Sequence, residues 1–259
     1  MLVDSHCHLN YEGLSDQIPA VLARAGDAGV SHMVCICSRL SEFGVVSAVA
    51  EANDRVFCSV GIHPHDVEKE PGTDVETLVD LASHPKTVGI GETGLDFYYE
   101  NSPREAQERN FRTHIRAART TGLPLIIHTR DADDTTIGIL REEAEDGFFP
   151  GLIHCFTAGK LVADCALDLG LYISLSGIIT FKNAEEIRTT VKSVPLERIL
   201  VETDSPFLAP IPHRGKANEP AFVVHTAQKA AEIFGVSFEE LATATTDNFF
   251  RLFTKAVRR

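Results

Sequence analysis

The chain has 259 residues, 44% of them hydrophobic and 24% charged, and its formal net charge is −13. This composition is typical of a globular protein, and no stretch approaches the roughly 20 apolar residues that a membrane-spanning helix needs. Because phosphate binding depends largely on Lys and Arg, the acidic balance argues against general affinity for nucleic acid. A polyanionic substrate would need metal ions or a local basic patch.

Strand and helix patterns alternate from the first residues to the last. A short apolar run in residues 1–10 leads into Asp4, His6 and His8. Buried-type strands are then expected at 32–37, 55–60, 87–91, 123–127, 151–153, 171–175 and 198–201. Helical spacing of apolar residues predicts helices at 16–28, 41–53, 73–83, 131–146, 160–169, 184–194, 220–234 and 237–257.

One further helix, between Pro103 and Gly122, has the best-defined ends. Ser102 is expected to be its N-cap, with a proline in the first turn and Glu105 as the reciprocal member of a capping box. Gly122 is expected to end the helix in a left-handed conformation.

Eight strands alternating with helices predict a parallel sheet, and eight such units at this length predict closure into a single (β/α)8 TIM barrel spanning residues 1–259. An open doubly wound sheet is the rival fold. It is disfavoured because no glycine-rich phosphate-binding motif follows any strand, and because unusual polar residues follow many strands rather than one switch point.

The N-terminus has no basic segment followed by an apolar one, so we expect no cleaved signal peptide, a cytoplasmic location and no membrane partner. The six cysteines lack C-x-x-C spacing and are expected to be reduced. Cys35 and Cys37 would share one face of a strand, where core packing is favoured over a metal pair. The sequence leaves the oligomeric state open, a monomer included.

His6 and His8 form the first candidate metal-binding pair. Side chains alternate along a strand, so these two histidines point to one side and Cys7 points to the other. Imidazoles bind divalent ions well, but two of them make an incomplete coordination shell. An ordinary polar strand end is the alternative unless other segments supply more ligands.

Other strands end in residues of the same chemical kind. In a barrel the carboxyl ends of all strands meet at one face, where the loops build the site. The candidate ligands at these ends are His6, His8, His63, Glu92, His128, His154 and Asp204. They exceed one tetrahedral shell, which indicates two ions bridged by a carboxylate.

Eight motifs occur in order along almost the whole chain: DSHCHLN (4–10), GIHPH (61–65), GETGLDFYY (91–99), HTRDA (128–132), HCF (154–156), SGIITFKN (176–183), ETDSPFLAP (202–210) and RGKANEP (214–220). Together they resemble the TatD-like metal-dependent deoxyribonucleases of the amidohydrolase superfamily. The resemblance implies a hydrolase with two divalent ions, for which Mg, Mn and Zn are the candidates.

The resemblance also implies roles for individual residues. The implied ligands of one ion are His6, His8, Glu92 and Asp204. The implied ligands of the second ion are Glu92, His128 and His154. His63 is similar to an active-site histidine near the substrate phosphate.

Two such cations would lower the pKa of a water molecule and neutralise charge on phosphoryl oxygens, with Glu92 between them. Asp204 is the candidate proton acceptor, and a role as ligand alone is the alternative. His63 is expected to hold a phosphate oxygen or protonate the leaving group, unless a backbone carbonyl satisfies it.

Other polar residues near the strand ends are candidate positioning or substrate-binding groups. Asp96 and Arg130 are expected either to orient the ligands or to pair within their loops. A local basic patch of Arg214 and Lys216, together with Asn218, is expected to contact phosphate, with a solvated surface as the alternative. The remaining histidines are expected to be structural or surface residues: His32, His84, His114, His213 and His225.

Three functional hypotheses follow. The first is a phosphodiesterase that hydrolyses DNA, from an end or on single strands. The second is hydrolysis of a small cyclic amide, ester or lactone, although many such superfamily enzymes bridge their metals with a modified lysine where this chain has Glu92. The third is a non-catalytic metal-binding protein that docks a partner at the barrel mouth.

Overall fold

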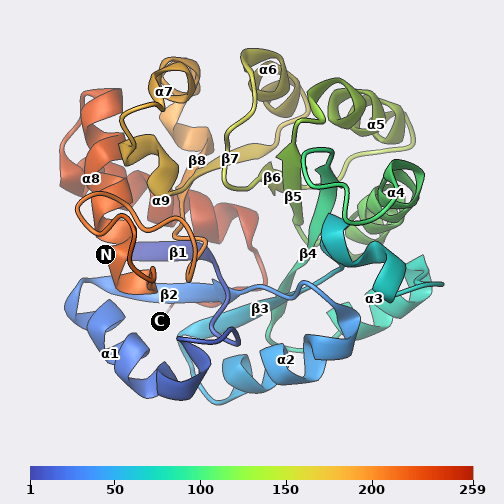
Figure 1. Cartoon of the computed structure of the whole chain (residues 1–259), viewed down its shortest axis with the longest axis horizontal. Helices are drawn as coiled ribbons and strands as arrows, with labels where there is room; N and C mark the ends of the chain where they lie inside the picture. Colours follow the sequence, from blue (N-terminus) through green and yellow to red (C-terminus); the bar gives the residue numbers. More distant parts are fainter. Residues whose placement is uncertain (259) are drawn as a thin grey trace.

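The computed structural model describes residues 1–258 and has the predicted (β/α)8 barrel architecture (Figure 1). Eight parallel strands pair in sequence order: β1 (Leu2–Cys7), β2 (Val30–Cys35), β3 (Val56–Val60), β4 (Thr87–Asp96), β5 (Leu125–Arg130), β6 (Gly151–Ile153), β7 (Tyr172–Leu175) and β8 (Ile199–Val201). The rival open doubly wound sheet is therefore wrong.

Helices follow the strands and surround them. Their bounds are α1 (Ile18–Asp27), α2 (Phe43–Glu51), α3 (Val75–Ala82), α4 (Arg104–Thr121), α5 (Asp133–Glu145), α6 (Lys160–Asp168), α7 (Glu185–Val191), α8 (Val223–Phe234) and α9 (Phe238–Leu252). Short 3-10 helices occupy Ser15–Gln17, Leu40–Glu42, Pro64–Lys69, Gly177–Thr180, Leu196–Arg198 and Pro220–Phe222. Among the helices of residues 1–258, none combines the length and the apolar character needed to cross a membrane.

The barrel closes where β1 meets the segment after β8. The Asp204 N–H donates to the His6 carbonyl at 2.9 Å, and the His8 N–H donates to the Ser205 carbonyl at 2.8 Å. Inside the barrel, the Ser5 Oγ lies 3.1 Å from the Val201 carbonyl. These contacts join the first and last strands at the end of the barrel where the candidate ligands lie.

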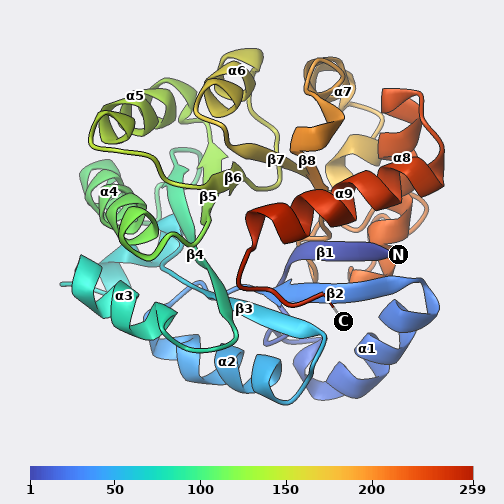
Figure 2. The same ribbon diagram turned by 180° about the vertical axis from the view of Figure 1, so that it is seen from behind.

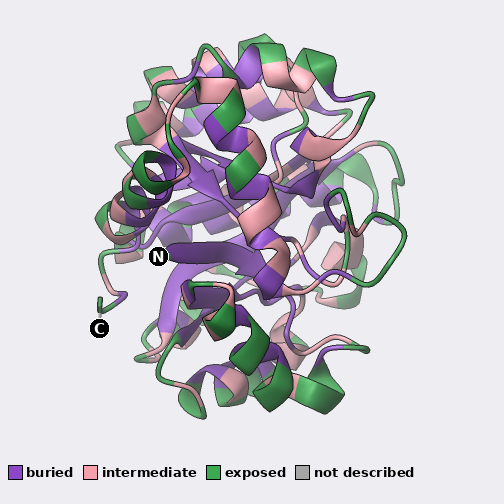
Figure 3. Ribbon diagram, turned by 90° about the vertical axis from the view of Figure 1, so that its left-hand side faces the viewer, coloured by how far each residue is buried: buried purple, intermediate pink, exposed green. Residues whose placement is uncertain are grey.

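Two layers of apolar side chains hold the barrel together. One layer packs the outward faces of the strands against the surrounding helices, and almost all strand residues are buried (Figure 3). The other fills the barrel interior with residues from alternate positions, such as Val34, Ile126 and Leu200. All six cysteines are free and five are buried, so the prediction of reduced cysteines is confirmed, and Cys35 and Cys37 belong to the outer layer.

Helix α9 covers the end of the barrel opposite the candidate ligands (Figure 2). Phe249, Leu252 and Phe253 pack with the residues that fill the barrel interior. The helix ends at Leu252, whereas the apolar pattern predicted that it continues to residue 257. Phe253 is fully buried and has left the helical conformation, with φ −88° and ψ 67°.

The predicted capping box at the start of α4 does not form. The Ser102 Oγ instead donates to the His65 carbonyl at 3.2 Å and accepts from the Glu68 N–H at 3.3 Å. Pro103 therefore occupies the N-cap position without a side-chain cap. At the other end the prediction is confirmed, because Gly122 adopts φ +69° after the last helical residue.

Candidate metal centre

The candidate ligands surround the floor of an open cavity at the carboxyl end of the strands. The cavity has a volume of about 1150 Å³. Its lining includes His8, His63, Glu92, His128, His154 and Asp204. The sequence-predicted ligands therefore converge on one place, although they come from segments spread over two hundred residues.

Strand β1 aims two histidines at this floor. Where β1 pairs with β2, Asp4 lies opposite Met33 and Cys7 opposite Cys35, so β1 contains one extra residue between these pairs. The Nε2 atoms of His6 and His8 are 3.3 Å apart, as the alternation of side chains predicts. Cys7 points away from them into the outer apolar layer.

Strand β4 aims Glu92 in a similar way. Ile90 pairs with Leu125 and Thr93 with Ile127, so β4 also carries one extra residue at this point. Gly91 has φ +137°, and a Cβ atom there would lie 2.7 Å from the Ile126 carbonyl oxygen. Glu92 lies within β4 rather than after it, because this strand continues to Asp96 instead of ending at residue 91.

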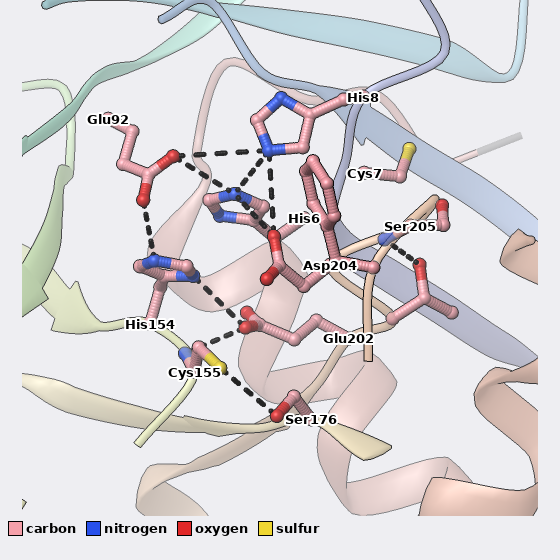
Figure 4. Close-up of polar contacts among 12 residues, drawn as sticks. His6, Cys7, His8, Glu92, His154, Cys155, Ser176, Glu202, Asp204 and Ser205 are labelled. Atoms are coloured by element: carbon pink, nitrogen blue, oxygen red, sulfur yellow. Dashed lines mark hydrogen bonds and ion pairs between the residues drawn. The ribbon is translucent and has the colours of Figure 1, made fainter. Parts of the chain in front are cut away.

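The two carboxylate oxygens of Glu92 face two different groups of histidines (Figure 4). The Oε2 atom lies 3.4 Å from the His6 Nε2 and 4.0 Å from the His8 Nε2. The Oε1 atom lies 2.7 Å from the His154 Nε2 and 3.2 Å from the His128 Nδ1. Glu92 therefore lies between two groups of nitrogen donors, with one carboxylate oxygen facing each group.

Asp204 completes the group of donors on the Oε2 side. Its Oδ1 atom lies 3.5 Å from the Nε2 atoms of both His6 and His8. Asp204 has φ +56°, in the left-handed region that non-glycine residues seldom adopt. The hydrogen bond of its N–H to the His6 carbonyl fixes this conformation and places the carboxylate beside β1.

Buried carboxylates behind the site orient two of the histidines. The His128 Nε2 donates to the Asp96 Oδ2 at 3.1 Å, which leaves Nδ1 free to bind a cation. The His154 Nδ1 donates to the Glu202 Oε1 at 3.1 Å, which leaves Nε2 free in the same way. Asp96 is a predicted positioning group, whereas the sequence analysis assigns no role to Glu202, although it is the first residue of the motif ETDSPFLAP.

His63 carries its proton on the nitrogen that faces the cavity. Its Nδ1 accepts the His65 N–H at 3.1 Å, so the neutral ring is protonated at Nε2, which lies 3.5 Å from the Glu92 Oε1. Burial lowers the pKa of His63 to about 3, so the ring is neutral. A protonated nitrogen can donate a hydrogen bond to substrate but cannot bind a metal ion. His63 is therefore better suited to contact substrate, although His63, Glu92 and His128 lie close enough to form a ligand set.

The charges in the site are coupled. Burial raises the pKa of Glu92, but the neighbouring His154, His63 and His6 outweigh burial and lower the pKa well below its usual value. Burial lowers the pKa of His154, but Glu92 and Glu202 outweigh it and raise the pKa. Without cations, protons on histidine would neutralise these carboxylates, so metal binding competes with protonation.

The donor set fits divalent cations. Two imidazole nitrogens bound to one tetrahedral zinc ion would be about 3.3–3.4 Å apart, given metal–nitrogen distances of about 2.0–2.1 Å. The Nε2 atoms of His6 and His8 are 3.3 Å apart, and the His128 Nδ1 is 3.4 Å from the His154 Nε2. Mixed imidazole and carboxylate donors suit Zn²⁺ and Mn²⁺.

A family model described as TatD related DNase matches residues 3–254 of the chain. The chain belongs to the TatD family. YcfH from Escherichia coli K12, an uncharacterized metal-dependent hydrolase, is 46% identical over 255 residues, which cover 97% of this chain and 95% of that protein. YabD from Bacillus subtilis, with the same description, is 38% identical over 253 residues, covering 98% and 99%.

Solved structures agree with this membership. The TatD homolog YJJV from Escherichia coli K12 superposes with a TM-score of 0.91 at 27% identity, and the match covers 98% of each chain. A TatD-family hydrolase from Entamoeba histolytica has the same fold, with a TM-score of 0.82 at 23% identity over 98% of each chain. The protein is accordingly a metal-dependent hydrolase with histidine and carboxylate clusters able to bind metal.

Only one of the four predicted substrate-binding residues of this TatD-family chain lines the cavity. Arg130 lines the cavity. Arg214 and Lys216 are not among the residues that line it, and the Arg214 guanidinium lies 4.2 Å from the centre of the Phe181 ring. The Asn218 side chain is fully buried, and its Nδ2 donates to the carbonyls of Thr203 and Phe207. Asn218 holds the loop after β8 in place.

His114 is structural, as predicted, and it supports the segment that carries His63. Its ring is fully buried on α4. The His114 Nε2 accepts the Ile62 N–H at 3.0 Å, and its Nδ1 donates to the Asn110 carbonyl at 2.8 Å. Burial lowers the pKa of His114 to about 4, although the hydrogen bond to Asn110 opposes this shift.

This pKa predicts a pH-dependent contribution to stability. The unfolded chain binds a proton at His114 near pH 6.5, and the folded chain does so only near pH 4, so between these values the unfolded state holds more protons. The free energy of unfolding of the wild type should therefore fall by about 3 kcal/mol from this residue as the pH drops from 6.5 to 4. Urea unfolding of the chelator-treated wild type and of His114→Gln across this range tests it. Parallel pH profiles for the two proteins would contradict the assignment.

Proposed function

We propose that this TatD-family hydrolase is a phosphodiesterase that cleaves DNA with a pair of divalent cations. The observation that carries the proposal is the Glu92 carboxylate, whose two oxygens face separate groups of nitrogen donors at the floor of an open cavity. A bridged pair of cations suits in-line displacement at phosphorus, because charge develops on both the attacking and the leaving oxygens. The description of the matching family model supports the same activity.

The residues divide the work as follows. His6, His8 and Asp204 with the Glu92 Oε2 would hold one cation, and His128 and His154 with Oε1 would hold the other. Bound there, the cations would lower the pKa of a water molecule and neutralise phosphoryl charge.

Two further side chains act on the reactants. Burial raises the pKa of Asp204, but the hydrogen bond with His8 and the charges of His6 and His154 outweigh burial and lower it, so Asp204 is an ionised proton acceptor at the cavity wall. The His63 Nε2–H is aimed into the cavity, where it would donate to a non-bridging phosphate oxygen.

An assay with defined substrates tests the proposal. The purified protein is incubated with single-stranded and double-stranded oligonucleotides in Mg²⁺, Mn²⁺ and Zn²⁺, and in parallel with lactones and cyclic amides. The proposal expects metal-dependent cleavage of DNA that a chelator abolishes. If the protein leaves DNA intact in every metal but turns over a lactone or a cyclic amide, hydrolysis of a small cyclic substrate replaces it.

A further inference from the structure

Three large aromatic side chains are exposed beside the cavity. Tyr98 is 57% exposed, Tyr99 54% and Phe207 51%. Tyr99 and Phe207 line the cavity, and Tyr98 packs edge-to-face against Tyr99 with ring centres 4.8 Å apart. These rings lie outside the barrel core, and their clustering at the mouth of a cavity is typical of a binding site.

The Arg130 guanidinium lies close to both tyrosine rings. Its guanidinium carbon is 4.1 Å from the centre of the Tyr98 ring and 4.7 Å from that of Tyr99. Within residues 1–258, Arg130 forms no ion pair with a carboxylate, in contrast to Arg116 and Arg119, which both bind Glu143. An unneutralised guanidinium at the mouth of a cavity is available for phosphate.

This tyrosine–arginine platform is fixed relative to the candidate metal centre. The Asp96 Oδ1 accepts the N–H groups of Tyr98 and Tyr99 at 3.1 and 3.0 Å. The other oxygen of the same carboxylate accepts from the His128 Nε2 at 3.1 Å, and Asp96 is fully buried. One rigid carboxylate therefore sets the position of both the platform and a candidate ligand.

Phe207 lies on the other side of the centre. Its ring centre is 6.2 Å from that of His8 and 6.1 Å from that of Tyr11, both on the side of the Glu92 Oε2. The Tyr99 ring is instead 5.4 Å from that of His65, which in turn packs against His63 on the Oε1 side. Aromatic surfaces thus flank the place where a phosphate would meet the cations.

We propose that Tyr99, supported by Tyr98 and Arg130, stacks against the nucleobase on one side of the scissile phosphate, and that Phe207 stacks against the base on the other side. This inference rests on the proposed function and assigns the residues that would hold the bases of an unpaired strand at that site. Stacking on aromatic rings is tolerant of sequence but requires bases that are not paired in a duplex. Arg130 adds charge to the same surface, which an acidic protein needs to hold a polyanion.

The test compares a single-stranded oligonucleotide with one of equal length in which the two nucleotides around the cleavage position are abasic. Binding is measured by fluorescence anisotropy, separately from cleavage, for the wild type, Tyr98→Ala/Tyr99→Ala, Phe207→Ala and Phe207→Tyr. Phe148→Ala is the matched control, because Phe148 is 71% exposed but does not line the cavity.

Removal of a stacking partner should weaken binding to the intact strand by about tenfold. The wild type, Phe207→Tyr and Phe148→Ala should prefer the intact strand to the abasic one, and the double tyrosine variant and Phe207→Ala should lose much of that preference. Equal affinity of the wild type for intact and abasic strands, or an unchanged preference in the variants, would overturn the stacking subsite. Binding that depends on bases without any cleavage would instead refute the proposed activity and leave the subsite standing.

Discussion

A Glu92→Gln variant is expected to fold but to lose metal-dependent hydrolysis by about 10³-fold or more. The glutamine has the same shape, yet only its neutral carbonyl oxygen can bind a cation. The carboxylate offers two charged oxygens, of which Oε1 lies 2.7 Å from the His154 Nε2 and Oε2 lies 3.4 Å from the His6 Nε2. The cations contribute several kcal/mol to the stabilisation of the transition state, and each 1.36 kcal/mol changes the rate tenfold. The turnover of the substrate identified in the metal assay measures this effect.

Metal binding gives a second and independent measurement for the same variant. Cations that bind only the folded chain raise its melting temperature, so the wild type should gain thermal stability on addition of Mn²⁺ or Zn²⁺ and Glu92→Gln should gain less. Glu105→Gln, in the first turn of α4 with its carboxylate 91% exposed, is the matched control and should behave as wild type. Wild-type turnover together with a wild-type metal shift in Glu92→Gln would refute a bridging role for this carboxylate.

The convergence of the candidate ligands could be predicted because it depends on two general regularities. Side chains alternate along a strand, which puts His6 and His8 on one face, and parallel barrel strands all end at one rim. The positions of His128 and Asp204 followed from the second regularity, whereas that of Glu92 also depends on the extra residue in β4. Neither regularity requires knowledge of a distant contact.

Features that depend on distant contacts could not be predicted. Glu202 accepts the His154 Nδ1 proton across 48 residues of sequence, and although Glu202 begins the motif ETDSPFLAP, nothing local identifies His154 as its partner. Ser102 has the local pattern of a helix cap, but its hydroxyl hydrogen-bonds the backbone of His65 and Glu68 instead of capping α4. Asn218 looked like a polar loop residue, and only the fold buries it beneath the chain that carries Thr203.

The extra residues in β1 and β4 were also invisible in the sequence. Each one shifts the register between neighbouring strands, by one residue before Cys7 and before Thr93. A regular strand would send Glu92 to the same face as Ile90, into the outer apolar layer. The irregularity therefore places the charged residue over the cavity while Ile90 keeps its place in the core.

Removal of Glu202 should show how much metal binding depends on the orientation of a ligating histidine, because Glu202 contacts His154 but is not itself one of the predicted ligands. Its Oε1 accepts the Cys155 N–H at 2.7 Å as well as the His154 Nδ1. Its Oε2 has no hydrogen-bond partner among the described residues, and neither has the buried Nδ1 of His6. The rings of His6 and His154 stack with centres 3.9 Å apart, and donor atoms of both lie within 4.8 Å of the Glu202 carboxylate. Glu202 thus orients His154 directly and lies close to His6.

Glu202→Ala should weaken metal binding by about 10–100-fold, the usual effect of removing a carboxylate that orients a ligating histidine. It should also lower the free energy of unfolding by about 3 kcal/mol, because two buried N–H donors lose their acceptor. Glu143→Ala on α5 is the matched control. Glu143 is also a buried glutamate, but its partners are Arg116 and Arg119, which lie outside the site. Both variants should be less stable in chelator, but only Glu202→Ala should require more Mn²⁺ or Zn²⁺ for half-saturation in calorimetry. Equal metal affinities in the two variants would show that Glu202 only stabilises the fold and does not orient a metal ligand.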